Sequence, residues 1–450
     1  MEQSFGRMGT PMRRMLITAA CLGVLAATAA CGGGAAPALP TDQAGPAGQP
    51  PASSAEPEAV TADPPMAFDM SKGVALPRTA LQANMGGSVT SKFMTLRDRT
   101  GYIIAPESLS AVDVLTGREK WNTRIEGPAA DPNAHKGPFV EQSGPRPPLV
   151  TDQLAVGAVP LRMPEQGTTP GYLALAVIAV NPQTGAKVWQ TNTKIADDQY
   201  GISGDRSVTH VVAATGKAVV ASFAQSEGNL TVALDPATGK QLWVRKDYDA
   251  GSVNGDVVVG VDSNVAENES MVQATALDIA TGQQKWVGAA KSSAVEILPA
   301  DPAMVVLKAN EYSSGHAFLK FLDAATGAEK FSVEGTRNLG PDSYGDCLYD
   351  EQSVLACTDS GVLTAYDAKA GTKLWSLPDQ AANRVAPGGL TVAWHGALYG
   401  YTNGRQPIVL DAKTGKDLST EVGFVPDWVS KYAAAGVDQD GSPKAYPVKK

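Results

Sequence analysis

Two cysteines in the C-terminal part of the chain have the spacing of a disulfide. They are Cys347 and Cys357, in the sequence GDCLYDEQSVLAC. A turn near residues 351–353 would place them opposite each other on paired strands, where Cβ atoms lie about 4.5–5.5 Å apart, close to disulfide range. Two free buried thiols are the alternative, and no histidine lies nearby to complete a metal site. We therefore expect a structural disulfide, formed outside the cytoplasm.

No residues have the spacing of a catalytic or metal-binding motif. The histidines His135, His210, His316 and His395 are scattered along the chain. The patterns Gly-x-Ser-x-Gly and His-Glu-x-x-His are absent, as is a phosphate-binding glycine loop. The sequence DQDG (438–441) is too short for an EF-hand calcium loop, which ends in Glu. We predict no catalytic residue, no metal and no cofactor, so the protein is not expected to be an enzyme.

A pattern of eleven residues occurs seven times, with variation, and ALDPATGKQLW (233–243) is one copy. In each copy an apolar stretch leads to an Asp or Asn that can accept hydrogen bonds from backbone N–H groups two or three residues further on. A Gly four residues later supplies the positive φ of a tight turn. Each copy is therefore a β-hairpin. The Asp or Asn positions are Asp113, Asn181, Asp235, Asp278, Asp323, Asp367 and Asp411, spaced 43–68 residues apart.

A large aromatic residue ends six of the seven hairpins. A side chain of this size buries about 150–250 Å², and its expected place is the seam between neighbouring sheets. Ser419 holds this position in the seventh hairpin, so we expect that seam to be packed differently. The six aromatic residues are Trp121, Trp189, Trp243, Trp286, Phe331 and Trp375.

Strand-type hairpins at this period are typical of a β-propeller or a β-solenoid. Further β-branched segments, such as DVVVGVD (256–262), lie between the hairpins and indicate four short strands per unit. The segments 72–82 and 432–448 can combine into one more unit, which joins the two ends of the chain and removes exposed edges. We predict an all-β, eight-bladed propeller of four-stranded antiparallel blades, with seven blades as the alternative.

The repeated hairpin resembles that of the pyrroloquinoline-quinone-like (PQQ-like) β-propeller repeat family, over nearly all of residues 70–450. The resemblance implies a propeller but no particular chemistry. Quinone dehydrogenases of the family carry two adjacent cysteines and a calcium site, and this chain has no Cys-Cys pair. It is more similar to the non-enzymatic branch. That branch includes the lipoprotein of the outer-membrane β-barrel assembly machine and actinobacterial PQQ-binding-like repeat proteins.

The first 67 residues are expected to be an export signal and a linker. Arg13 and Arg14 precede a short apolar run, and Thr-Ala-Ala then leads to Cys31. This ending resembles a bacterial lipobox, which implies lipid attachment at Cys31; an ordinary signal peptide is the alternative. Residues 31–67 are rich in Ala, Pro and Gly and have too little apolar bulk to fold. The expected parts are a lipoprotein signal peptide (1–30), a disordered tether (31–67) and the propeller (68–450).

Charge and architecture favour a binding function. The formal net charge of −9 argues against nucleic-acid binding, which relies on Lys and Arg. We expect a monomeric, lipid-anchored protein outside the cytoplasm that binds an envelope protein or a cell-wall component with one face of the ring. The alternatives are an oxidoreductase that depends on PQQ and calcium, and a sensor of a small ligand. The long connection 126–148, with Phe139, is either a binding element or a plain surface insertion.

Overall fold

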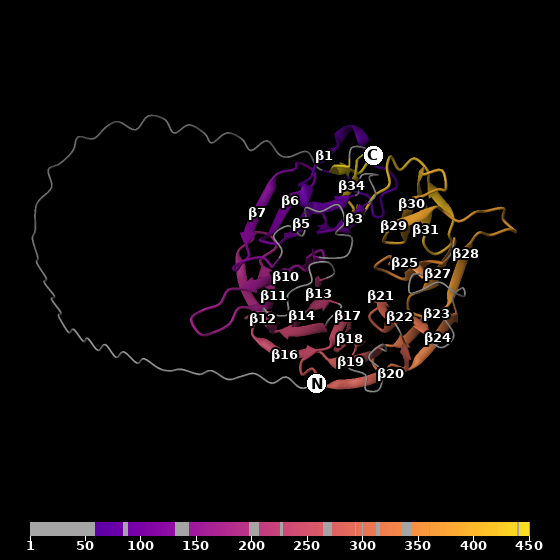
Figure 1. Cartoon of the computed structure of the whole chain (residues 1–450). Coiled ribbons are helices and arrows are strands. Elements are labelled where there is room, and N and C mark those ends of the chain that lie inside the picture. Colours follow the sequence, from indigo (N-terminus) through magenta and orange to yellow (C-terminus); the bar gives the residue numbers. More distant parts are fainter. Residues whose placement is uncertain are drawn as a thin grey trace, which may run out of the picture. The chain divides into compact units, whose positions relative to one another are not determined.

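The protein is an eight-bladed β-propeller in a computed structural model (Figure 1). The model describes residues 59–83, 89–130, 144–197, 207–225, 228–263, 272–292, 294–298, 300–311, 316–334, 344–359, 361–438 and 441–449. The blades follow one another around the ring in chain order. The first strand of a blade lies nearest the ring axis and the fourth lies at the rim (Figure 1). The predicted eight-bladed fold is therefore confirmed.

Blades 1 to 4 consist of antiparallel strands in chain order. Blade 1 contains β4 (Met94–Arg97), β5 (Thr100–Ala105), β6 (Ser108–Asp113) and β7 (Glu119–Arg124). Blade 2 contains β9 (Leu149–Val150), β10 (Ala155–Met163), β11 (Tyr172–Val180) and β12 (Lys187–Asp197). Blade 3 contains β13 (Val208–Ala214), β14 (Val219–Gln225), β15 (Gly228–Leu234) and β16 (Gln241–Lys246), with β8 (Gly144–Pro145) added at its inner edge. Blade 4 contains β17 (Tyr248–Asn254), β18 (Val257–Asp262), β19 (Val272–Asp278) and β20 (Gln284–Ser292).

Blades 5 to 7 repeat this plan, and blade 8 takes one strand from the N-terminal side. Blade 5 contains β21 (Ala294–Leu298), β22 (Met304–Glu311), β23 (His316–Asp323) and β24 (Glu329–Glu334). Blade 6 contains β25 (Tyr344–Tyr349), β26 (Val354–Asp359), β27 (Val362–Asp367) and β28 (Lys373–Leu377). Blade 7 contains β29 (Gly389–Trp394), β30 (Ala397–Tyr401), β31 (Pro407–Asp411) and β32 (Asp417–Ser419). Blade 8 contains β33 (Trp428–Val429), β34 (Ala433–Val437), β35 (Pro443–Pro447) and β1 (Val74–Ala75). The remaining elements are β2 (Leu81–Ala83), β3 (Val89–Lys92) and the 3-10 helices η1 (Met70–Lys72) and η2 (Arg78–Ala80).

Each repeated hairpin turns around its Asp or Asn side chain. In blade 3, Asp235 Oδ1 accepts hydrogen bonds from the N–H groups of Ala237 (3.1 Å) and Thr238 (2.8 Å) and from the Thr238 hydroxyl (2.7 Å). Gly239 follows with a φ of +70° and donates its N–H to the Asp235 carbonyl at 2.9 Å. These bonds satisfy the backbone groups of the turn, and the glycine avoids the strain that a side chain meets at positive φ.

The indole that ends one blade seals the seam to the next. Trp189 of blade 2 donates its Nε1–H to the Pro236 carbonyl at 2.9 Å, inside the turn of blade 3. A Cβ on Gly239 of this turn would lie 2.7 Å from the indole, so the turn needs glycine for two separate reasons. Four further indoles repeat the bond across their own seams: Trp121 to Pro182 (3.0 Å), Trp243 to Ile279 (2.8 Å), Trp286 to Ala324 (3.0 Å) and Trp375 to Ala412 (2.8 Å).

The seam between blades 5 and 6 is built differently, because phenylalanine has no N–H to donate. Phe331 is half-buried, and its ring centroid lies 5.8 Å from that of Phe321 on β23. Phe321, not Phe331, lies beneath the turn glycine Gly371. The centroid of the Phe321 ring lies 5.4 Å from that of the Tyr366 ring. An aromatic cluster with ring contacts of about 0.5–1.5 kcal/mol each takes the place of the indole hydrogen bond.

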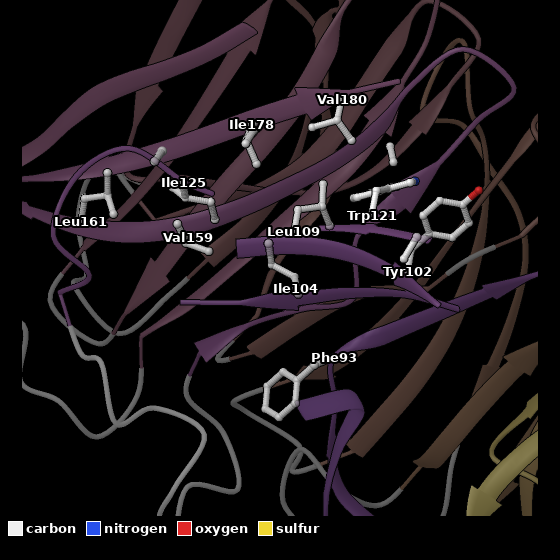
Figure 2. Packing of buried hydrophobic residues seen from close by; sticks show 13 residues of the cluster. Phe93, Tyr102, Ile104, Leu109, Trp121, Ile125, Val159, Leu161, Ile178 and Val180 are labelled. Carbon is white, nitrogen blue, oxygen red and sulfur yellow. The ribbon is translucent and has the colours of Figure 1, made fainter. Parts of the chain in front are cut away.

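Deeper in each seam, apolar side chains of the two facing sheets interlock. Figure 2 shows this for blades 1 and 2, where Ile104 and Leu109 meet Val159 and Ile178, all at most 1% exposed. Gly157 of β10 leaves room for Ile104, since a Cβ there would lie 2.5 Å from the Ile104 side chain. The core is therefore a series of seam clusters arranged around the ring.

The two ends of the chain close the ring in blade 8. Val74 and Ala75 of β1 pair antiparallel with Ala445 and Lys444 of β35, as predicted for a composite blade. On the inner side, Trp428 is buried and donates its indole N–H to the Met94 carbonyl of blade 1 at 2.8 Å.

An N-terminal strap, residues 59–69, covers the seam between blades 7 and 8, where Ser419 stands in place of an aromatic residue. Phe68 of the strap contacts Phe424, and its N–H donates to the Val422 carbonyl at 3.1 Å. Tyr399 of blade 7 donates its hydroxyl to the Pro65 carbonyl at 2.8 Å. The sequence analysis places residues 59–67 in the linker; in the structure they lie against these two blades.

Three glycine substitutions distinguish the strain of a positive φ from the overpacking of a side chain against the indole. We expect Gly239→Ala to lower the free energy of unfolding by about 2–5 kcal/mol, since it combines positive φ with overpacking against Trp189. Gly255→Ala, with a φ of +61° and open space around it, should cost about 1–2 kcal/mol. Gly216→Ala has neither problem and should stay within about 0.5 kcal/mol of wild type. Denaturant unfolding measures all three, and equal losses at Gly239 and Gly255 would contradict the role of the indole.

Acid should weaken the turn of blade 5. A hydrogen bond from Lys330, with others from Thr326, lowers the pKa of Asp323 to about 2. Because this folded-state pKa lies below the ordinary value of 3.8, the stability contributed by Asp323 is present above about pH 4 and is lost as pH falls towards 2. Asp323→Asn should remove part of this dependence in thermal unfolding measured between pH 2 and 5. Asn181 already serves as the turn residue of blade 2, so the variant should fold.

Candidate functional site

The expected disulfide is present between Cys347 on β25 and Cys357 on β26. The two residues are direct partners in the register of these strands, on either side of a turn at residues 350–353. Both side chains pack in the apolar cluster that contains Phe321 and Tyr366. Their surroundings are those of a structural bond. The predicted lipid-attachment residue Cys31, and Phe139 of the 126–148 connection, lie outside the described residues.

Among the described residues, no cluster of His, Cys, Asp and Glu suits the calcium ion of a quinone dehydrogenase. Within these ranges no group of three His, Cys, Asp or Glu side chains is placed to hold a metal ion. The disulfide joins cysteines ten residues apart across a hairpin, unlike the adjacent pair of quinone dehydrogenases. His210 contacts the Ala250 carbonyl through Nε2 at 2.8 Å, and His395 contacts Asp63 of the strap through Nδ1 at 2.6 Å. These residues do not fit the cofactor that the family name suggests.

The 126–148 connection is anchored at both of its described ends. At its start, Ala130 N–H donates to the Pro160 carbonyl at 3.1 Å, along the inner edge of β10. At its end, β8 pairs in parallel with β13, the inner strand of blade 3. Gly144 N–H donates to the Ser207 carbonyl and Arg146 N–H to the Thr209 carbonyl, both at 2.7 Å. The connection therefore passes blade 2 and adds a strand to blade 3.

Charged side chains on or next to the inner strands of blades 3 to 5 gather near this added strand. We call them the inner-strand cluster: Arg146, His210 on β13, Asp249 on β17, Glu296 on β21 and Lys308 on β22. Lys308 Nζ lies 3.1 Å from Glu296 Oε2, and His210 Nε2 lies 3.8 Å from Asp249 Oδ1. The cluster thus spans the inner parts of blades 3, 4 and 5.

The electrostatics of the cluster are those of a partly desolvated site. The protein groups around the Arg146 guanidinium lower its pKa by desolvation, and the negative charge of Glu296 opposes this effect. Part of the Arg146 side chain remains exposed to solvent. Burial raises the pKa of Asp249, and interactions with His210 and Ser222 only partly offset this effect. Asp249 Oδ1 is buried and accepts no hydrogen bond from the described residues. A buried acceptor without a donor costs about 1–3 kcal/mol, so Asp249 is suited to a donor from a ligand.

A separate pocket of about 390 Å³ opens between blades 6 and 7. Leu377, Ile408 and Leu410 form its apolar floor, and the ion pair of Arg384 and Asp417 (2.5 Å) lies at its side. Val385, in the loop after β28, is 74% exposed at this pocket. The volume suits one small ligand or one side chain of a partner.

The sequence analysis did not identify the inner-strand cluster. Its members are far apart in the chain and belong to no motif, because adjacent blades bring them together. The one indication of this cluster in the sequence is Arg146, a charged residue between prolines in the long 126–148 connection.

Comparisons with known proteins agree with this architecture. The family model described as "Outer membrane protein assembly factor BamB" matches residues 175–416, more than half of the chain. A computationally designed protein, Ika8, is 14% identical, with a TM-score of 0.51 over 86% of this chain and 100% of that one. BamB from Moraxella catarrhalis is 14% identical, with a TM-score of 0.40 over 87% and 93% of the two chains.

The quinohemoprotein alcohol dehydrogenase of Comamonas testosteroni is also similar. It is 12% identical, with a TM-score of 0.46 over 83% of this chain and 76% of that one. No curated protein matches the chain. Only the likeness to Ika8, with a TM-score above 0.5, supports the fold, and at 14% identity it supports nothing more. In the part of the chain that the structure covers, no helix is long and apolar enough to cross a membrane.

Loss of the disulfide should destabilise blade 6. We expect Cys347→Ser/Cys357→Ser to lower the free energy of unfolding by about 2–3 kcal/mol, the range for a short closed loop. Denaturant unfolding with and without reductant measures the loss. The reductant should destabilise the wild type and leave the double variant unchanged, whereas an equal response of both would contradict the assignment.

Proposed function

The chain belongs to the family of the outer membrane protein assembly factor BamB, and we propose that it acts as a scaffold that binds a partner protein of the cell envelope. The family name supports a role beside other envelope proteins. The described residues present neither the cysteines nor the metal-binding group of a quinone dehydrogenase, which favours binding over catalysis.

The observation that carries this proposal is the strand β8 next to the inner-strand cluster. An extended segment already binds at the inner edge of β13 through backbone hydrogen bonds. Strand addition of this kind is a common mode of peptide recognition, in which the backbone supplies affinity and side-chain sites supply specificity. The partly buried charged side chains of the cluster, His210, Asp249 and Lys308, are such side-chain sites. We therefore place partner binding on the inner strands of blades 3 to 5.

The proposed location is outside the cytoplasm, on the membrane. Export would use residues 1–30, a lipid on Cys31 would anchor the chain, and residues 31–58 would separate the propeller and its strap from the bilayer. As a flexible coil these residues would span about 26–32 Å. The scaffold would act as a monomer.

Site-specific photo-crosslinking in membranes of the source organism tests the proposal. A photoreactive residue at Glu296 on inner strand β21 should capture an envelope protein. The same residue at Leu242 on outer strand β16, which is 41% exposed at the rim, should not capture it. Capture of nothing at Glu296, or of the same proteins at both positions, would overturn the proposal. Dye reduction by the purified protein with added PQQ and calcium would instead establish an oxidoreductase.

A further inference from the structure

The strand β8 is held by few backbone hydrogen bonds. It pairs with β13 at two positions only, Val208 with Gly144 and Thr209 with Pro145. Pro145 and Pro147 have no N–H group to donate, so donors are available only at Gly144 and Arg146. Two hydrogen bonds between neutral groups contribute about 0.5–1.5 kcal/mol each, which a competing strand can exceed.

The edge that β8 covers is longer than β8 itself. Strand β13 continues from His210 to Ala214, and in the described residues its partners are only β14 and β8. The inner edge beyond Thr209 therefore has no strand partner among these residues. A longer extended segment that entered along the same line could form more backbone hydrogen bonds than β8 forms.

The charges near this edge suit a cationic side chain. Arg146 extends from the end of β8, and Glu296 of blade 5 stabilises its charge. Asp249 of blade 4 has a buried oxygen, Oδ1, without a hydrogen-bond donor among the described residues, and burial raises the pKa of this carboxyl. His210 and Lys308 also face the cluster, and each lies next to one of these carboxylates. A basic group of a partner could therefore donate a hydrogen bond to Asp249 Oδ1.

The geometry points to a strand-addition site on β13 for an extended, basic, proline-containing peptide, which the chain's own residues 144–147 occupy in its absence. This inference rests on the proposed scaffold function and names the chemistry of the partner segment. Residues 144–147 act as a weak internal ligand: they keep the edge covered and leave when a longer basic segment binds. The formal net charge of −9 on the chain further favours a basic partner.

A peptide-binding experiment on the full chain tests the inference. The probe is a fluorescent peptide with the sequence GPRPPLV, that of residues 144–150, and the control peptide replaces its Arg with Glu. The variant Gly144→Pro/Arg146→Ala should vacate the edge. Gly144 has a φ of +107°, which proline cannot adopt, and its N–H is one of the two donors that hold β8. The variant should bind GPRPPLV at least tenfold more tightly than wild type, and neither protein should bind the Glu peptide.

Two further measurements make the result decisive. Asp249→Asn/Glu296→Gln, introduced into the vacated variant, should abolish the gain in affinity. In the wild type, saturating GPRPPLV should speed deuterium exchange of residues 144–147, a readout that does not depend on a variant folding. Equal binding to wild type and folded variant, or unchanged exchange, would overturn the inference.

The outcome is separable from that of the scaffold proposal. Capture of a partner at Glu296 without peptide binding leaves the scaffold intact and refutes the peptide class. Peptide binding without any captured envelope partner supports the peptide class and refutes the scaffold.

Discussion

The bond between an indole and the next blade's turn is the interaction on which the ring depends. Each of the five hairpin tryptophans fills the space left by a glycine and donates to a carbonyl of the same turn, as Trp189 does with Gly239 and Pro236. The turn itself is held by hydrogen bonds to its own Asp or Asn. Local hairpin geometry and contact between blades are thereby satisfied by one set of residues. This explains why one short pattern suffices to specify most of the propeller.

Where the pattern fails, the structure uses other means to close the seam. Phe321 and Tyr366 form an aromatic cluster between blades 5 and 6, where Phe331 offers no donor. Between blades 7 and 8 the strap residue Phe68 packs with Phe424, where Ser419 offers no ring. Blade 7 also contains a proline within a strand, Pro407 of β31. It lies outside the positions at which β31 pairs with the three-residue β32, so its missing N–H leaves no hydrogen bond of that pair unmade.

The fold could be predicted from the sequence to the extent that it is local or repeated. The hairpins fixed the blade count once residues 72–82 were paired with the C-terminal segment, because strand pairing at both ends leaves no open edge. The disulfide followed from two cysteines at equal distances from one turn. The inner-strand cluster could not be predicted, since Arg146 and Glu296 are neighbours only through the ring. The strap at Asp63–Pro65 was also beyond reach, because its polar and proline-rich composition gave no sign that Tyr399 and His395 would bind it.

Blade 8 has a consequence for the order in which the protein can be built. Its outermost strand is made of residues 74–75, whereas the strand that pairs with it ends at residue 447. The early segment therefore stays unpaired until almost the whole polypeptide is available to fold. Contacts between such distant residues slow folding and leave intermediates exposed to aggregation. A chain that lacked its last few residues would leave β1 without a partner and the ring with unpaired strand edges.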